Sequence, residues 1–266
     1  MYKPKKRAII LSGSSDIGKE LIKSLINEGY EVFATYYKSN PDFNLLKKEY
    51  WLRLKISDYN SEEYLAWLNK IYKWDLFISC IGSQKPVGNV EDLDPLDWVN
   101  GVHDNSTYQV GAFIKALPFR EKKIESVVLF FAGGGTNNST PAYSAQTLGK
   151  ISLIKAVELL DNELSDVKIS ILGPGWVGTK IHQATLNAKY LAGNNYQKTI
   201  KMLENPEKMN TIGKVINDIN IIRKMPKNLV GGRNFSSVHD DLTIENLKKL
   251  ESLDNDFYRL RRKLND

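Results

Sequence analysis

Residues 7–18 read RAIILSGSSDIG, a short apolar run that passes directly into small residues. An unbroken apolar run of this length is typical of a strand covered on both faces, and the glycine and serines after it predict a tight turn into a helix. In a nucleotide-binding βαβ unit, such a turn lets the backbone approach a pyrophosphate, and the helix amino terminus supplies donors. The residues expected to contact phosphate are Ser12, Gly13, Ser14, Ser15, Asp16, Ile17 and Gly18.

The rest of the chain alternates β-rich runs with stretches of helical length. DLFISC at 75–80 and SVVLFF at 126–131 are as apolar as the first run. This alternation predicts an α/β fold, a Rossmann-type doubly wound parallel sheet. The expected strands are 7–12, 31–36, 50–55, 75–80, 125–131, 167–172 and 233–238. The expected helices are 17–28, 61–71, 104–117, 143–164 and 206–223.

Helix start signals accompany three of these segments. Asp16 is expected to cap the first helix, Ser61 with Glu63 the second, and Pro206 is expected to open the last.

The length and pattern predict a single domain over residues 1–266. A chain of this size with 42% hydrophobic content can bury one large core, and no repeat or linker divides it. Residues 173–205 break the alternation after a strand, so we expect an insertion that covers the substrate. Residues 241–266 are expected to form two short charged helices.

The composition excludes several classes of protein. The single cysteine, Cys80, excludes a disulfide framework and fits a reducing compartment, so a cytoplasmic protein is expected. The short amino-terminal apolar run predicts a strand rather than a signal peptide or membrane span. The net charge is +6, but lysines alternate with acidic residues and form no nucleic-acid-binding stripe. We expect a phosphorylated small molecule as partner, with no nucleic acid, membrane or metal site.

Taken together, these features resemble the short-chain dehydrogenase/reductase family, through nearly the whole chain. The family's glycine-rich turn aligns with Leu11, Ser12, Asp16 and Gly18, so only its last glycine is kept in register. PGWVGT at 174–179 matches the family's Pro-Gly turn and the threonine that contacts the nicotinamide carboxamide. The resemblance implies a dinucleotide cofactor. It implies further cofactor contacts from Gly82, Lys150, Pro174, Gly175, Val177 and Thr179.

The end of the second expected strand bears on which dinucleotide binds. The segment ATYYKS at 34–39 contains Lys38 and no carboxylate. An acidic residue there would accept from the ribose 2′-hydroxyl of NAD, whereas a cation suits the 2′-phosphate of NADP. Lys38 therefore favours NADP over NAD, with a merely solvated lysine as the alternative.

The resemblance also implies a catalytic set. In this family a tyrosine exchanges a proton with the substrate oxygen, a lysine one helical turn later lowers the tyrosine pKa, a serine orients the substrate and an asparagine holds a water relay. Asn105 and Lys150 fit the asparagine and the lysine. In that register Gln146 stands at the tyrosine position, and Ala132 or Gly133 at the serine position. Glutamine has no titrating proton, so it cannot do the tyrosine's work.

Tyr143 is a displaced candidate for the acid/base. It lies two helical turns before Lys150, a rise of about 10 Å, and would have to swing in from the loop before the helix. A bound water, His182 or a group on the substrate is the alternative proton donor. Thr136 and His182 are expected to contact the substrate.

Two late segments extend the resemblance. GWVGTKIH at 175–182 and GRNFSSVHD at 232–240 are similar to short-chain reductases associated with bacterial surface-polysaccharide and nucleotide-sugar synthesis. This implies NADP- or NAD-dependent interconversion of an alcohol and a ketone on a sugar or nucleotide sugar, in a homodimer or homotetramer packed through 104–117 and 143–164. Two alternatives stay open: a catalytically impaired homologue acting as a cofactor-binding regulator or partner subunit, and a non-redox epimerase or lyase in the same pocket.

Overall fold

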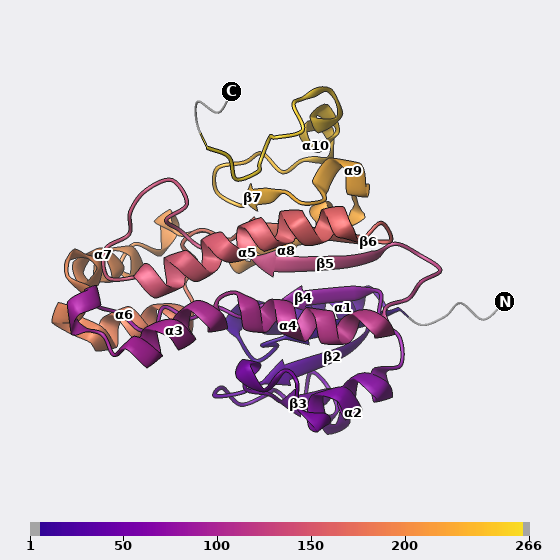
Figure 1. The fold of residues 1–266 in the computed structure, drawn as a ribbon, viewed down its shortest axis with the longest axis horizontal. Helices are drawn as coiled ribbons and strands as arrows, with labels where there is room; N and C mark the ends of the chain where they lie inside the picture. Colours follow the sequence, from indigo (N-terminus) through magenta and orange to yellow (C-terminus); the bar gives the residue numbers. More distant parts are fainter. Residues whose placement is uncertain (1–5, 263–266) are drawn as a thin grey trace.

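A single seven-stranded parallel sheet organises the computed structural model, which describes residues 6–262 (Figure 1). The strand order is β3-β2-β1-β4-β5-β6-β7, and each neighbouring pair is parallel. The strands are Arg7–Leu11 (β1), Glu31–Tyr36 (β2), Trp51–Arg53 (β3), Leu76–Ser79 (β4), Ser126–Phe131 (β5), Val167–Gly173 (β6) and Asn234–Ser236 (β7). The predicted Rossmann-type fold class is confirmed.

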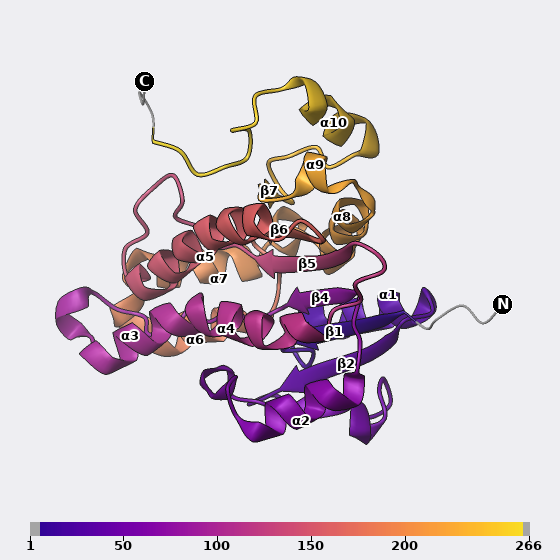
Figure 2. The ribbon, with the colours of Figure 1, turned by 45° about the vertical axis from the view of Figure 1, so that its right-hand side comes forward.

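Helices cover both faces of the sheet, and Figure 1 shows α4 and α5 in front of the strands. The longer helices are Asp16–Asn27 (α1), Glu62–Ile71 (α2), Pro95–Asp104 (α3), Thr107–Ala116 (α4), Ser144–Glu163 (α5), Asn194–Leu203 (α7) and Ile212–Lys224 (α8). The shorter ones are Gln183–Ala188 (α6), Lys227–Val230 (α9) and Ile244–Lys249 (α10). The arrows of the sheet point toward the side of the molecule where α3 and α6 lie (Figure 2).

Alternate residues of each strand enter two separate hydrophobic cores. Ala8 and Ile10 of β1 pack into the core beneath α1 and α8. Ile9 and Leu11 pack into the core beneath α2, α4 and α5. All four side chains are fully buried. The central strands β1, β4 and β5 are apolar along most of their length because both of their faces are covered.

Two of the three expected helix starts differ from the structure. The hydroxyl of Ser15, not the carboxylate of Asp16, accepts from the amide of Gly18, so Asp16 lies inside the first turn of α1. Ser61 caps α2 as predicted. Pro206 opens only a 3₁₀ turn, and α8 begins after Thr211, whose hydroxyl accepts from the amide of Lys214. Ser15 and Thr211 cap α1 and α8 because their hydroxyls reach the amide of the third helical residue.

The helix predicted over 104–117 was wrong in its first part. Asn105 is the C-cap residue of α3, a helix that was not predicted, and α4 begins at Thr107. The two helices meet at this asparagine because its side-chain amide donates to the Gly101 carbonyl and closes α3.

The late segments also contain helices. Within 173–205, α6 and α7 lie beyond the carboxyl ends of the strands (Figure 1). The tail contains α10 and a 3₁₀ turn over Leu250–Ser252. Further along, the Asn234 amide of β7 donates to the Tyr258 carbonyl at 2.7 Å, so the tail pairs with an edge strand. Between residues 6 and 262, no helix has the length and apolarity to cross a bilayer.

Gly149 offers a test of the packing between α3 and α5. A Cβ atom at Gly149 would lie 2.7 Å from the Val102 carbonyl oxygen and 2.8 Å from Cβ of Asn105. We expect Gly149→Ala to lower the free energy of unfolding by about 1–3 kcal/mol, because two helix backbones must separate. Urea unfolding monitored by circular dichroism measures this change.

Gly213→Ala is the matched control. Gly213 lies in the first turn of α8, where the nearest atom to an added Cβ is the Thr211 hydroxyl at 4.0 Å. Alanine there should leave stability unchanged or raise it by up to about 1 kcal/mol. Equal losses in both variants would contradict the close approach of α3 and α5.

Candidate active site

A cleft opens at the carboxyl edge of the sheet, beside the point where the strand order reverses. The chain leaves β1 toward β2 and β3 and then returns to pair β4 with the other side of β1. The cleft has a volume of about 900 Å³. Ligand pockets are usually about 300–1,000 Å³, so this one has room for a large ligand. It lies where doubly wound sheets bind their ligands.

The turn predicted to contact phosphate forms one wall of the cleft. Most of its expected residues line the cleft, namely Ser12, Ser14, Ser15, Asp16 and Ile17. Gly13 and Gly18 do not. A Cβ at Gly13 would meet Cβ of Ala34 at 2.7 Å, and one at Gly18 would meet the Ser12 carbonyl oxygen at 2.7 Å. These two glycines therefore let the turn pack on β2 and α1 rather than face a ligand.

Ser12 occupies a backbone conformation that favours glycine. Its φ is +57°, in the left-handed region. The amide of Ser12 donates to the Thr35 hydroxyl on β2 at 2.9 Å, which holds the residue in place.

Asp16 forms a contact across the cleft. Its carboxylate accepts from the backbone amide of Lys180 at 2.8 Å and lies 4.0 Å from the Lys180 ammonium group. Both residues line the cleft, Asp16 from α1 and Lys180 from the segment after β6. The contact therefore ties the turn before α1 to the segment that leads into α6. A phosphate bound at the start of α1 would meet this carboxylate.

Lysines gather at the cleft end near β2 and β3. Lys38 and Lys55 both line the cleft. Asp104 also lines it, and burial raises its pKa while Lys55 and Lys38 oppose that rise. The Lys38 ammonium lies 5.7 Å from the ring centroid of Tyr37. This end of the cleft is suited to an anionic group.

Lys150 lies at the floor of the cleft with its amine between two strand ends. Nζ donates to the carbonyl of Phe131 at 2.8 Å and to that of Ile81 at 3.1 Å. The residue is only 3% exposed, and burial lowers its pKa to about 7. Cys80 lies close enough to affect it, but burial raises the pKa of that thiol to about 12, so it is neutral near pH 7. Lys150 therefore titrates near neutrality.

The positions expected for tyrosine and serine carry other groups. Gln146 lines the cleft one helical turn before Lys150, and its side chain has no hydrogen-bond partner among residues 6–262. Ala132 lines the cleft at the end of β5. A Cβ at Gly133 would lie 2.8 Å from Cγ of Lys150, so a serine there would displace the lysine. Thr136 lies outside the lining residues.

The Tyr143 hydroxyl lies away from the cleft lining. It is 2.5 Å from the Thr185 hydroxyl, which in turn donates to the side-chain oxygen of Gln84 at 2.8 Å. The Thr185 hydroxyl has one proton, which it donates to Gln84, so the Tyr143 hydroxyl is the donor in its hydrogen bond to Thr185. Tyr143 is 7% exposed and packs with Val87, and burial raises its pKa. In this arrangement Tyr143, at the start of α5, is linked to α6 through Thr185, and Thr185 links α6 to the loop after β4.

Asn105 is fully buried beside the cleft and uses its amide on the backbone. Nδ2 donates to the carbonyls of Ser83 and Gly101, each at 2.9 Å, and Oδ1 accepts from the Ser83 amide at 3.1 Å. The side chain joins the end of α3 to the loop after β4. That loop carries Gly82 and Ser83, which both line the cleft.

The segment after β6 supplies the opposite wall. Pro174 and Thr179 line the cleft, whereas Gly175 and Val177 do not. His182 also lies outside the lining. Its Nε2 is 2.9 Å from the Val177 carbonyl, which only accepts, so Nε2 bears the proton. Burial lowers the pKa of His182, and its Nδ1 is buried without a partner. A neutral ring in this position holds the backbone of the wall.

Several residues that line the cleft were not predicted from the sequence, among them Lys55, Gln84 and Asn187. Lys55 and Gln84 each follow a strand by a few residues, which is a signal that could have identified them. Gln183 and Asn187 lie on α6, which was not predicted, and the Gln183 amide donates to the Asn187 side chain at 2.8 Å.

The balance of charge in the cleft is positive. The lining lysines are Lys38, Lys55, Lys85, Lys150 and Lys180, against the acids Asp16 and Asp104. Such a lining attracts anions. Within residues 6–262, no group of three His, Cys, Asp or Glu side chains is arranged to hold a metal ion.

Of the comparisons with known proteins, the one with solved structures bears on the fold. No protein-family model matches the sequence, and no curated protein matches it. A short-chain dehydrogenase/reductase structure from Saccharomyces cerevisiae is 21% identical, with a TM-score of 0.75 over 90% of this chain and 98% of that one. A ligand-free aldohexose dehydrogenase from Thermoplasma acidophilum is 14% identical, with a TM-score of 0.72 over 87% and 92% of the two chains. A small-chain dehydrogenase in complex with NADPH is 17% identical, with a TM-score of 0.68 over 87% and 96%. The chain therefore has the fold of short-chain dehydrogenases/reductases.

The lowered pKa of Lys150 predicts a pH dependence of stability. An unfolded lysine has a pKa near 10.4, so between pH 7 and 10 the unfolded chain binds more protons at this residue than the folded chain. Stability contributed by this group must then rise with pH across that window. The unfolding free energy of the wild type should therefore increase relative to that of Lys150→Met, by up to about 1.4 kcal/mol per pH unit.

Urea unfolding of both proteins from pH 6 to pH 9.5 measures the difference. Lys70→Met, which removes an exposed lysine on α2, is the control. A constant difference between the wild type and Lys150→Met would contradict the desolvated state of Lys150.

Proposed function

We propose that the protein is an NAD(P)-dependent oxidoreductase that interconverts an alcohol and a ketone on a sugar or nucleotide sugar. The observation that carries the proposal is the open, lysine-lined cleft at the reversal of strand order, with Lys150 at its floor. When bound, the dinucleotide supplies or accepts the hydride. The residues of this chain bind it, orient it and manage protons.

The residues of the cleft fit a dinucleotide. The wall from Ser12 to Ile17 would receive the pyrophosphate, and Pro174 and Thr179 would face the nicotinamide. Asp16 stands against this arrangement as a negative charge, but its hydrogen bond to the Lys180 amide occupies one carboxylate oxygen. One structure of similar fold is a complex with NADPH, which supports the same ligand class here.

We infer that NADP is preferred over NAD. Lys38 and Lys55 lie at the end of the cleft where the ribose of the adenosine would sit, and both influence the same carboxyl group, Asp104. Two cations near one site favour a 2′-phosphate over a hydroxyl.

The substrate end of the cleft favours a polyhydroxylated compound. Four carboxamide side chains line it, those of Gln84, Gln146, Gln183 and Asn187. A carboxamide both donates and accepts, so such a set suits hydroxyl groups. The likeness to a structure named as an aldohexose dehydrogenase supports the same substrate class. An association with surface-polysaccharide or nucleotide-sugar synthesis remains part of the proposal.

The proton in this reaction must come from a source other than a tyrosine beside Lys150. Gln146 cannot titrate, and the hydroxyl of Tyr143 donates to Thr185. His182 keeps its proton on the Val177 carbonyl. We therefore favour a bound water or a substrate group as the donor, with Lys150 and Asn105 retained from the catalytic set.

The absence of a tyrosine and a serine at the two expected catalytic positions favours a second candidate function. Gln146 and Ala132 stand where proton transfer and substrate orientation would occur. A homologue that binds the dinucleotide without turnover, as a regulator or partner subunit, would need only the binding parts of the cleft.

The proposal includes a homodimer or homotetramer in the cytoplasm. Apolar side chains are exposed on the two helices expected at the interface, Ile114 on α4 and Leu148 and Leu159 on α5. Within the described chain, Cys80 is a free cysteine, which fits a reducing compartment.

Fluorescence titration with NADPH and NADH tests the cofactor. We expect NADPH to bind more tightly, and Lys38→Glu to weaken NADPH by about tenfold or more while NADH changes little, because a charge-assisted contact to the 2′-phosphate is lost. Lys47→Glu makes the same charge change at an exposed lysine outside the cleft lining and should leave both affinities as they are. If neither dinucleotide binds at high micromolar concentration, the proposed function is wrong.

Turnover of the Gln146→Tyr variant tests the proton source. With NADPH and a panel of keto-sugars, we expect the rate of NADPH oxidation, at one NADPH per keto-sugar reduced, to rise by about tenfold or more over the wild type. The reason is that a positioned acid is restored next to Lys150. Gln146→Phe, which has the ring without the hydroxyl, should show no rise.

Tyr143→Phe should keep the wild-type rate of turnover, and loss of activity in this variant would instead make Tyr143 the acid. If turnover occurs without net change in cofactor, the epimerase or lyase alternative holds.

A further inference from the structure

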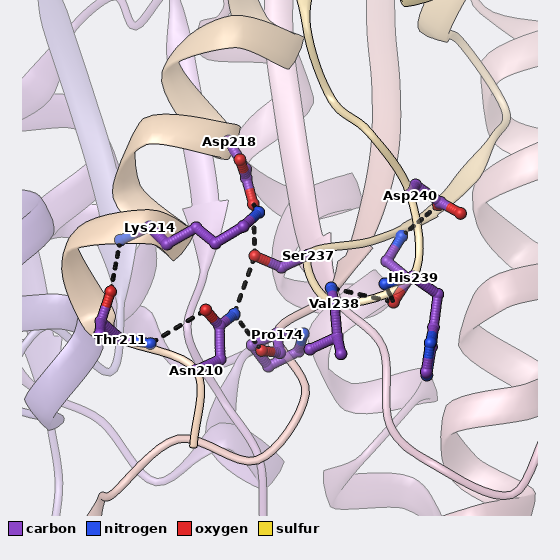
Figure 3. Close-up of polar contacts among 10 residues, drawn as sticks. Pro174, Asn210, Thr211, Lys214, Asp218, Ser237, Val238, His239 and Asp240 are labelled. Atoms are coloured by element: carbon purple, nitrogen blue, oxygen red, sulfur yellow. Dashed lines mark hydrogen bonds and ion pairs between the residues drawn. The ribbon is translucent and has the colours of Figure 1, made fainter. Parts of the chain in front are cut away.

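The turn after β6 is held by hydrogen bonds to its backbone from a distant part of the chain. Asn210, which precedes α8, donates from its amide to the Trp176 carbonyl at 2.7 Å and from Nδ2 to the Pro174 carbonyl at 2.8 Å. Asn210 also forms a parallel bridge with Val177. Figure 3 shows Asn210 between Pro174 and Ser237. One residue thus fixes two carbonyls of the wall that ends at Thr179.

A series of side-chain hydrogen bonds links Asn210 to the buried residues Ser237 and Asp218 (Figure 3). Nδ2 of Asn210 also donates to the Ser237 hydroxyl at 3.0 Å, and that hydroxyl donates to the Asp218 carboxylate. The same carboxylate accepts from the Lys214 ammonium at 2.8 Å. Ser237 and Asp218 are 1% and 2% exposed, so this serine has no access to a substrate. The chain of donors sets the orientation of the Asn210 amide, with both of its N–H groups used.

The turn after β6 is also constrained by its backbone conformation and by contacts other than those of Asn210. Gly175 has a φ of +73°, and a Cβ there would lie 2.2 Å from Cγ2 of Val238. The Val177 carbonyl is held from the other side by His182, whose ring stacks on Trp176 with centroids 4.8 Å apart. The carbonyls of Pro174, Trp176 and Val177 are therefore all occupied, which leaves the turn little freedom.

We propose that Asn210 is a positioning residue for the part of the ligand that binds between Thr179 and Lys150. It touches neither ligand nor reacting atoms, and it acts by fixing the wall that Pro174 and Thr179 present to the cleft. A residue that holds a binding wall in one geometry lowers the cost of ordering it when the ligand arrives. This inference rests on the proposed dinucleotide function, in which that part of the ligand is the nicotinamide.

Two ligands that differ only at the nicotinamide end test the proposal. Isothermal titration calorimetry compares NADPH with 2′-phospho-ADP-ribose, which lacks the nicotinamide and keeps the phosphates and adenosine. Asn210→Ala should weaken NADPH by roughly fivefold to tenfold and leave 2′-phospho-ADP-ribose within about twofold. Asn210→Asp, an isosteric change that removes both Nδ2 donors, should give the same pattern. Asn205→Ala removes an amide that donates to the Lys201 carbonyl of the preceding helix, α7, and should change neither affinity.

Amide hydrogen exchange without ligand provides the second measurement. Residues 175–180 should exchange faster in Asn210→Ala than in the wild type, with α1 unchanged. An equal loss of affinity for both ligands, no loss for either, or unchanged exchange in this turn would overturn the proposal. If wild-type protein binds neither ligand, the proposed function fails, and the exchange data still decide whether Asn210 holds the turn.

Discussion

The reversal of strand order at β1 is the constraint on which the rest of the site depends. β1 pairs with β2 on one side and with β4 on the other, and the helix that leaves β1 (α1) and the helix that leads from β4 to β5 (α4) cover opposite faces of the sheet. The loops at the carboxyl ends of these strands must therefore part, and the cleft of about 900 Å³ lies between them. Every wall of the site is attached to a strand end that this arrangement fixes.

Side chains from distant segments turn that opening into a defined site. Lys150 joins the ends of β4 and β5 through the carbonyls of Ile81 and Phe131. Asp16 joins α1 to the segment before α6 through the Lys180 amide. Asn105 joins α3 to the loop after β4. These contacts, which all use backbone groups, fix the walls of the cleft relative to one another, and its net positive lining favours an anionic ligand.

The strands and the position of the cleft could be predicted because both follow from local patterns. Apolar runs mark strands buried on two faces, and the small residues after β1 mark the turn at the cleft. The direction of individual side chains could not be predicted. Tyr143 turns to Thr185, 42 positions away, and Asp16 turns to Lys180, 164 positions away. Such contacts leave no local signal. The helix α3, which ends at Asn105, was also not predicted.

A crystal structure of the protein soaked with NADPH tests the central claim most directly. The account predicts the pyrophosphate against residues 14–17, the 2′-phosphate near Lys38 and Lys55, and the nicotinamide ring between Thr179 and Lys150. Density for NADPH elsewhere on the protein, or a cleft that stays empty at saturating NADPH, would contradict it.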